Sequence, residues 1–128
     1  MITILIAGMV AGADPSAAYI RNFMQCLHDV DSDARSQKVA PDGFDAFARQ
    51  HCASVETPYK ASLVTEDVSH GMSHKEAISD AASVIDSYYS ERRDGYQAFY
   101  KRNQAESEDT PASPPKVTPP PIPAAQPK

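Results

Sequence analysis

The chain has no tryptophan, only two cysteines and no surplus of basic residues, since 12 Lys and Arg stand against 17 Asp and Glu among 128 residues. A general nucleic-acid-binding protein needs a basic face that displaces counterions from phosphates, and a formal net charge of −5 argues against one. The sequence also lacks the run of about 20 apolar residues that a membrane-spanning helix requires. We therefore expect no nucleic-acid partner and no stable membrane anchor.

Motifs that carry catalysis are also missing. The chain has no Gly-x-Ser-x-Gly, no phosphate-binding loop, no His-Glu-x-x-His and no Cys-x-x-Cys. Asp29, Asp31 and Asp33 alternate, but they lack the glycine and the final glutamate of a calcium loop. We find no residue to which a catalytic role can be assigned, so we expect no enzyme activity and no cofactor.

The first thirteen residues are uncharged. An apolar run over 2–10 is followed by Ala-Gly-Ala at 11–13, a pattern typical of an export signal and its cleavage site. The segment has no Lys or Arg before the apolar run and is shorter than the usual 15–30 or so residues. A buried strand or a helical turn of a cytosolic protein is the alternative. We predict an export signal over 1–13 and a periplasmic or secreted location.

Three later segments have apolar residues at helical spacing, which predicts an all-α fold of an antiparallel helical hairpin plus a long third helix. The first segment covers about 15–34, with Asp14 as N-cap and Pro15 at the first helical position. The second begins near Pro41 and ends before residue 70. Pro58 lies inside it and predicts a kink or a break.

The third helix begins at a capping box, in which Ser73 and Glu76 satisfy each other's backbone amides. Its apolar stripe continues to about residue 104, so the predicted helical domain covers 14–105. Residues 106–128 are rich in proline and are expected to form a disordered tail.

Cys26 and Cys52 lie on the two helices of the predicted hairpin. Their midpoint in the sequence is Val39, within the stretch whose composition predicts the turn, so the two thiols face each other. Facing cysteines on packed helices can meet the Cα separation of about 4.4–6.8 Å that a disulfide needs. We predict a Cys26–Cys52 disulfide, which export to an oxidising compartment would permit.

Other roles for the cysteines are less well supported. Two buried free thiols are the alternative if the chain stays in the cytosol. A metal site with His28 and His51 has poor geometry, because Cys26 and His28 are two residues apart and point to nearly opposite sides of a helix.

A second candidate site is the turn that contains His70, Met72 and His74. Imidazole and thioether ligands suit copper, so we consider a copper or zinc site here as an alternative function. The other reading is a polar loop in which Gly71 ends the second helix.

The third helix carries an excess of aromatic residues, including Tyr88, Tyr96, Phe99 and Tyr100, next to basic ones. Most of this stripe is expected to be core, but its length leaves room for a protein partner or for self-association. The proline-rich tail could bind an aromatic groove. The leading expectation is a non-enzymatic structural or protein-interaction role in the cell envelope.

The stretches AAYIRNFMQCL and FDAFARQHCASVETPYKASL, after an export-like start, resemble small exported proteins of proteobacteria that carry one cysteine on each of two consecutive helices. The resemblance covers about residues 1–64. It implies an exported helical protein and implies no activity.

Overall fold

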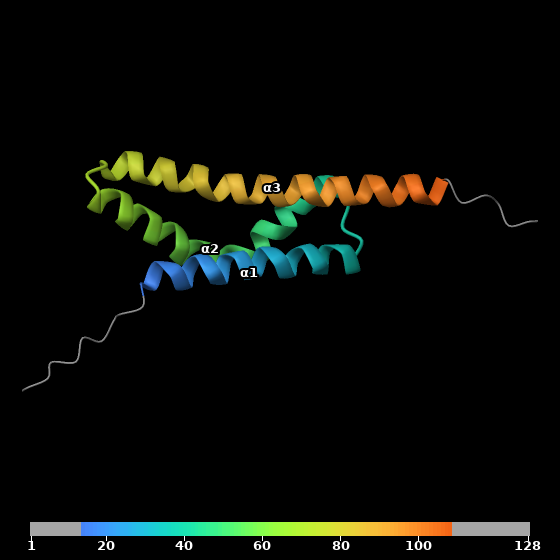
Figure 1. Ribbon diagram of the computed structural model, residues 1–128, viewed down its shortest axis with the longest axis horizontal. Coiled ribbons are helices and arrows are strands. Elements are labelled where there is room, and N and C mark those ends of the chain that lie inside the picture. Colours follow the sequence, from blue (N-terminus) through green and yellow to red (C-terminus); the bar gives the residue numbers. More distant parts are fainter. Residues whose placement is uncertain (1–13, 109–128) are drawn as a thin grey trace, which may run out of the picture.

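The computed structural model describes residues 14–108, and in that range the fold is all-α, as predicted (Figure 1). Helix α1 covers Pro15–Ser36, α2 covers Phe44–Ser69 and α3 covers His74–Glu108, with a single 3₁₀ turn at Pro41–Gly43 before α2. The predicted export signal and all but the first three residues of the predicted tail lie outside the described residues. No helix within 14–108 is long and apolar enough to cross a membrane.

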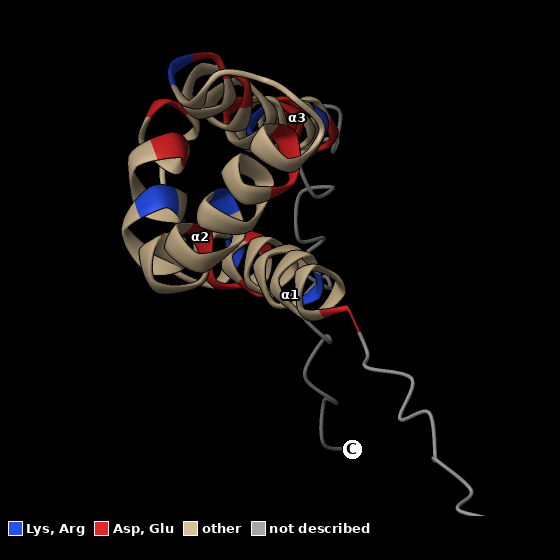
Figure 2. Cartoon of the chain, turned by 90° about the vertical axis from the view of Figure 1, so that its left-hand side faces the viewer, with Lys and Arg blue, Asp and Glu red and all other residues tan. Residues whose placement is uncertain are grey.

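The three helices form a bundle in which α2 packs against both of the others (Figure 1). α1 and α3 also touch each other directly, where Phe23 meets the rings of Tyr88 and Tyr89. Seen along the bundle, basic and acidic residues are interspersed over the three helices (Figure 2). This mixing agrees with the modest net charge of the chain.

α1 begins and ends with satisfied backbone groups. The Asp14 carboxylate accepts a hydrogen bond from the Ser16 amide at 3.0 Å, as expected of an N-cap. At the other end the Val39 amide bonds to the Ala34 carbonyl at 2.9 Å and the Lys38 amide to the Arg35 carbonyl at 3.2 Å. This is the Schellman pattern. It places Lys38 in the left-handed region with φ 54°, which costs a residue with a Cβ about 1–2 kcal/mol.

α2 stays helical across Pro58, so the predicted interruption is a bend and not a break (Figure 1). Figure 1 shows α2 bent near its middle, and Pro58 lies close to the midpoint of its range. Proline has no amide hydrogen and its ring crowds the preceding turn, which accounts for the bend. The bend lets one helix lie against α1 with its middle and reach α3 near both ends.

The turn from α2 to α3 is built as the sequence predicted. Gly71 has φ 99° and ends α2, while the Met72 amide bonds to the Asp67 carbonyl at 3.0 Å. The capping box is present: the Glu76 amide donates to the Ser73 hydroxyl at 3.3 Å, and the Glu76 carboxylate accepts from the Ser73 amide at 3.2 Å. The C-terminal cap of α2 and the capping box of α3 therefore both determine the position of this turn.

The core is formed by one face of each helix. Its fully buried side chains include Phe23 and Leu27 from α1, and Phe44 from α2. Tyr89 and Tyr96 contribute the aromatic part of α3. α3 continues as helix to Glu108, three residues beyond the predicted end of the domain. The side chains of 101–108 are all exposed, so the apolar pattern that marked the helix in the sequence stops before the helix does.

Candidate functional site

The two cysteines form the predicted disulfide. The Cα atoms of Cys26 and Cys52 are 5.8 Å apart, which lies within the range for a bridge. Cys52 is fully buried and Cys26 is half-buried, so the bridge joins α1 and α2 at the edge of the core. The alternatives of free thiols and of thiolate metal ligands are therefore wrong for this structure.

The histidines near the bridge form no metal site with it. His28 is exposed, and the His51 ring packs on Phe47 with the centroids 4.0 Å apart. The Nδ1 atom of His51 lies 2.8 Å from the Phe47 carbonyl oxygen, so this nitrogen carries the proton and donates to it. Within residues 14–108, no three His, Cys, Asp or Glu side chains are grouped so that they could hold a metal ion.

The turn between α2 and α3 brings together two of the three residues proposed as copper or zinc ligands. His70 and Met72 line a pocket of about 600 Å³ that Asp67 and Glu76 also line. His74 is exposed at the first position of α3 and is not among the described residues that line this pocket. The structure thus pairs His70 with Met72 but does not add His74 to the pair.

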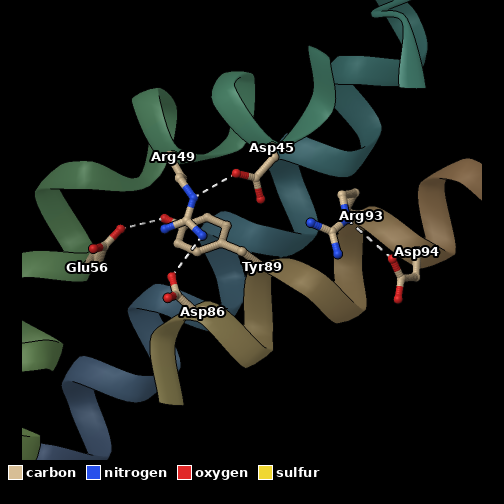
Figure 3. A network of polar contacts seen from close by, with 7 residues as sticks. All are labelled: Asp45, Arg49, Glu56, Asp86, Tyr89, Arg93 and Asp94. Carbon is tan, nitrogen blue, oxygen red and sulfur yellow. Dashed lines mark hydrogen bonds and ion pairs between the residues drawn. The ribbon is translucent and has the colours of Figure 1, made fainter. Parts of the chain in front are cut away.

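A polar network joins α2 to α3 (Figure 3). The Arg49 guanidinium donates to Asp45 and to Asp86, each at 2.9 Å, and lies 4.4 Å from the centre of the Tyr89 ring. The Tyr89 hydroxyl donates to Glu56 at 2.8 Å. Partial burial lowers the pKa of Arg49, but the hydrogen bonds and charges of the two aspartates outweigh it and raise the pKa overall. The charged and polar side chains of this network hydrogen-bond to one another, as expected of a contact that stabilises the fold.

The ionisation of buried tyrosines gives the first prediction, which concerns stability at high pH. Burial raises the pKa of Tyr59 to about 12, and burial also raises the pKa of Tyr89 and of Tyr96 above the usual 10.0. The neutral form is therefore favoured in the folded state. The stability that the folded state gains from keeping these tyrosines neutral is fully present below pH 10, and it is lost as the pH rises from about 10 to about 12. We expect the urea midpoint to fall over that range.

Single substitutions test this pH dependence. The variant Tyr59→Phe should show a shallower decline between pH 10 and about 12. The matched control is Tyr19→Phe, because Tyr19 is 37% exposed. Equal declines in both variants would contradict a role for buried tyrosine in the alkaline transition.

A groove with aromatic lining lies where α3 passes the end of α1. A groove of about 750 Å³ is lined there by Arg35 and Lys38 on one side and by α3 on the other. The α3 side presents Tyr96, Phe99 and Tyr100. Phe99 and Tyr100 are half-buried, whereas Tyr96 is buried and forms the floor.

Contacts to the end of α1 hold this groove in shape. The Tyr96 hydroxyl donates to the Val39 carbonyl at 2.6 Å, with the Ala34 carbonyl 3.2 Å away, so α3 is attached to the turn that ends α1. The Arg35 guanidinium lies 3.7 Å from the centre of the Phe99 ring and pairs with Asp31 at 2.8 Å. Beyond these residues the groove continues along Asn103, Gln104 and Ser107 to Glu108.

The sequence indicated one side of this groove and missed the other. The helical spacing of Tyr96, Phe99 and Tyr100 placed them on one stripe, and the aromatic excess suggested a surface for a partner. Arg35 and Lys38 carried no such signal, because they lie about sixty residues away along the chain and only the packing of α3 on the end of α1 brings them near. The left-handed conformation of Lys38 was likewise not visible, since glycine is the usual residue there.

Over residues 14–108, fold and geometry together define a disulfide-bonded bundle of three helices with an aromatic groove at one end. Comparison of the chain with protein-family models, with curated proteins and with solved structures finds no match.

Proposed function

We propose that this protein is exported and has a non-enzymatic structural or protein-interaction role in the cell envelope, binding a partner protein through the groove between the end of α1 and the C-terminal half of α3. The observation that carries the proposal is the set of half-buried aromatic rings beside an arginine at an open surface. Tyrosine and arginine are enriched among the residues that dominate binding energy at protein interfaces.

The chemistry of the groove supports a protein partner over a charged small molecule. Its charged lining residues are of both signs, with Arg35 and Lys38 at one end and Glu108 at the other. Aromatic faces and the amides of Asn103 and Gln104 suit a peptide surface, which offers apolar side chains together with carbonyl acceptors. The disulfide supports the location, because such bridges persist mainly in oxidising compartments.

Site-specific crosslinking in the cells that make the protein tests the interaction. A photo-reactive phenylalanine analogue at Tyr100 should yield a defined protein adduct, whereas the same analogue at the neighbouring Lys101 should not, because Lys101 is exposed and outside the groove. With the partner purified, Tyr100→Ala should weaken binding about tenfold or more, and Lys101→Ala should leave it nearly unchanged. Equal effects of the two alanine variants would refute the assignment of the groove.

Export is tested by the intact mass of the protein isolated from its native compartment. We expect a mass that lacks the first thirteen residues and that is lower by two hydrogen atoms than after reduction, owing to the bridge. The full-length mass, or a mass that reductant does not change, would contradict export or the bridge respectively.

Metal binding at the α2–α3 turn is a second candidate, since two of the three predicted ligands, His70 and Met72, line one pocket. Copper and zinc titrations of the purified chain, with His70→Ala as the comparison, test it. Absence of binding below about millimolar metal would remove this alternative.

A further inference from the structure

The aromatic groove lies beside the point where the chain leaves the described structure. Ser107 and Glu108, the last two described residues of α3, form part of its lining. The residues that follow have an unusual composition: 111–123 contain seven prolines among thirteen residues, together with Val117 and Ile122. A proline-rich segment is therefore tethered directly to the rim of an aromatic groove.

We propose that the proline-rich segment 111–123 folds back and binds the aromatic groove of its own chain. Seven prolines leave this segment thirteen carbonyls and only six amide hydrogens, so it is rich in acceptors that lack local donors. The groove has the complementary groups, because Arg35, Lys38 and Asn103 carry side-chain donors. The guanidinium of Arg35 has five N–H groups, more than its contact with Asp31 uses.

The shape of the proline-rich segment also matches that of the groove. Proline-rich segments pack their rings against aromatic side chains in open grooves, and their extended form is already stiff, so little conformational entropy is lost on binding. In this groove the Arg35 guanidinium lies 3.7 Å from the centre of the Phe99 ring, and the neighbouring Tyr100 is half-buried. The groove therefore has aromatic side chains at two adjacent positions of α3. Val117, four residues beyond the reversal, supplies further apolar contact for these rings.

The reach of the segment is sufficient for binding within one chain. The groove extends from Tyr96 to Glu108, which at 1.5 Å per helical residue is about 18 Å. Residues 109–113 are available for the reversal of direction, and about six residues of extended chain at 3.1 Å each then cover the groove. A short tether gives the segment an effective concentration of about millimolar at the groove, so even a weak contact is occupied in the same chain.

Binding of the segment would make it a competitor for whatever protein uses the groove. This competition rests on the proposed function, whereas the binding of the segment itself does not. A partner would have to displace the segment, and removal of the prolines would then strengthen partner binding.

The test compares amide ¹H–¹⁵N spectra of full-length chains. One variant replaces five prolines by serine: P114S, P115S, P119S, P120S and P121S. The matched control makes five changes that keep every proline: A112S, S113A, A124S, A125S and Q126A. We expect the proline variant to change amide shifts in the described helices only around the groove, at residues 35–38 and 96–108, and the control to leave them as in the native chain. A synthetic peptide of residues 109–128, added to the proline variant, should move the same resonances back toward their native positions.

The outcomes separate the alternatives. Unchanged groove resonances in the proline variant would overturn the proposal. Changes that disappear on dilution, together with a doubled mass by light scattering, would also overturn it, because the segment would then come from a second copy. If the Tyr100 crosslink fails but the spectral changes are present, the proposed partner protein is refuted and the binding of segment 111–123 to the groove is retained.

Discussion

Replacement of both cysteines by alanine should lower the free energy of unfolding by about 3–4 kcal/mol. The bridge closes a loop between residues 26 and 52, and the entropy that this loop takes from the unfolded chain has that magnitude in the chain-entropy model. Domains of this size have a total stability of about 5–15 kcal/mol. The loss is therefore a large share of what keeps α1 and α2 together, and urea unfolding followed by circular dichroism measures it.

Two controls separate the bridge from the packing of the side chains. Reductant should shift the urea midpoint of the native chain toward that of Cys26→Ala/Cys52→Ala and should not move the variant itself. The variant Cys52→Ser should be less stable than Cys52→Ala, because Cys52 is fully buried and a hydroxyl there has to be desolvated. A reduced native chain as stable as the oxidised one would show that the bridge adds nothing to the fold.

The second large effect is expected at Tyr96. Its ring is stacked on Phe44 with centroids 4.5 Å apart and an interplanar angle of 15°, and its hydroxyl bonds to the turn at Val39. Tyr96→Ala removes both contacts and leaves a cavity, which should cost about 3–5 kcal/mol. Tyr96→Phe keeps the ring and loses only the hydrogen bond, at a cost of about 0.5–1.5 kcal/mol.

The difference between the two variants is the informative quantity. Tyr100→Phe is the control for general loss of a hydroxyl on α3, and it should change the free energy of unfolding little because Tyr100 is half-buried in the groove. If Tyr96→Phe proves as costly as Tyr96→Ala, the hydroxyl and not the stacked ring attaches α3 to the end of α1. If both are near neutral, the packing of α3 on α1 does not depend on this residue.

The disulfide and Tyr96 stabilise the same hairpin at two different places. The bridge holds α1 to α2 within their length, and Tyr96 joins α3 to the turn that follows α1. Arg49 is a third stabilising contact, and it joins α2 to α3 (Figure 3). It adds less to the free energy of unfolding than the other two, because the aspartates that it pairs with are partly exposed to solvent. Tyr89 and Tyr96 thus both attach α3 to the rest of the bundle, and the groove begins at Tyr96.

Local features of the helices could be predicted from the sequence because they depend on residues close together in the chain. The Asp14 cap, the Ser73–Glu76 box and the end of α2 at Gly71 are all interactions over a few positions. The disulfide was also predictable, although it joins residues 26 apart, because a hairpin of two helices places mirror-related residues opposite each other. The ring contacts of the core were not predicted in this way: the Phe23 ring on α1 lies 5.4 Å from the Tyr59 ring on α2.

The sequence by itself determined the helices, their caps and the pairing of the cysteines, since periodicity and short-range hydrogen bonding decide these. Only the tertiary structure decided that Pro58 bends α2 without ending it, because the packing of both halves of α2 compensates for the lost backbone bond. It alone brought Arg35 onto Phe99, and so formed the groove, because side chains 64 positions apart meet only when the helices that carry them are packed together.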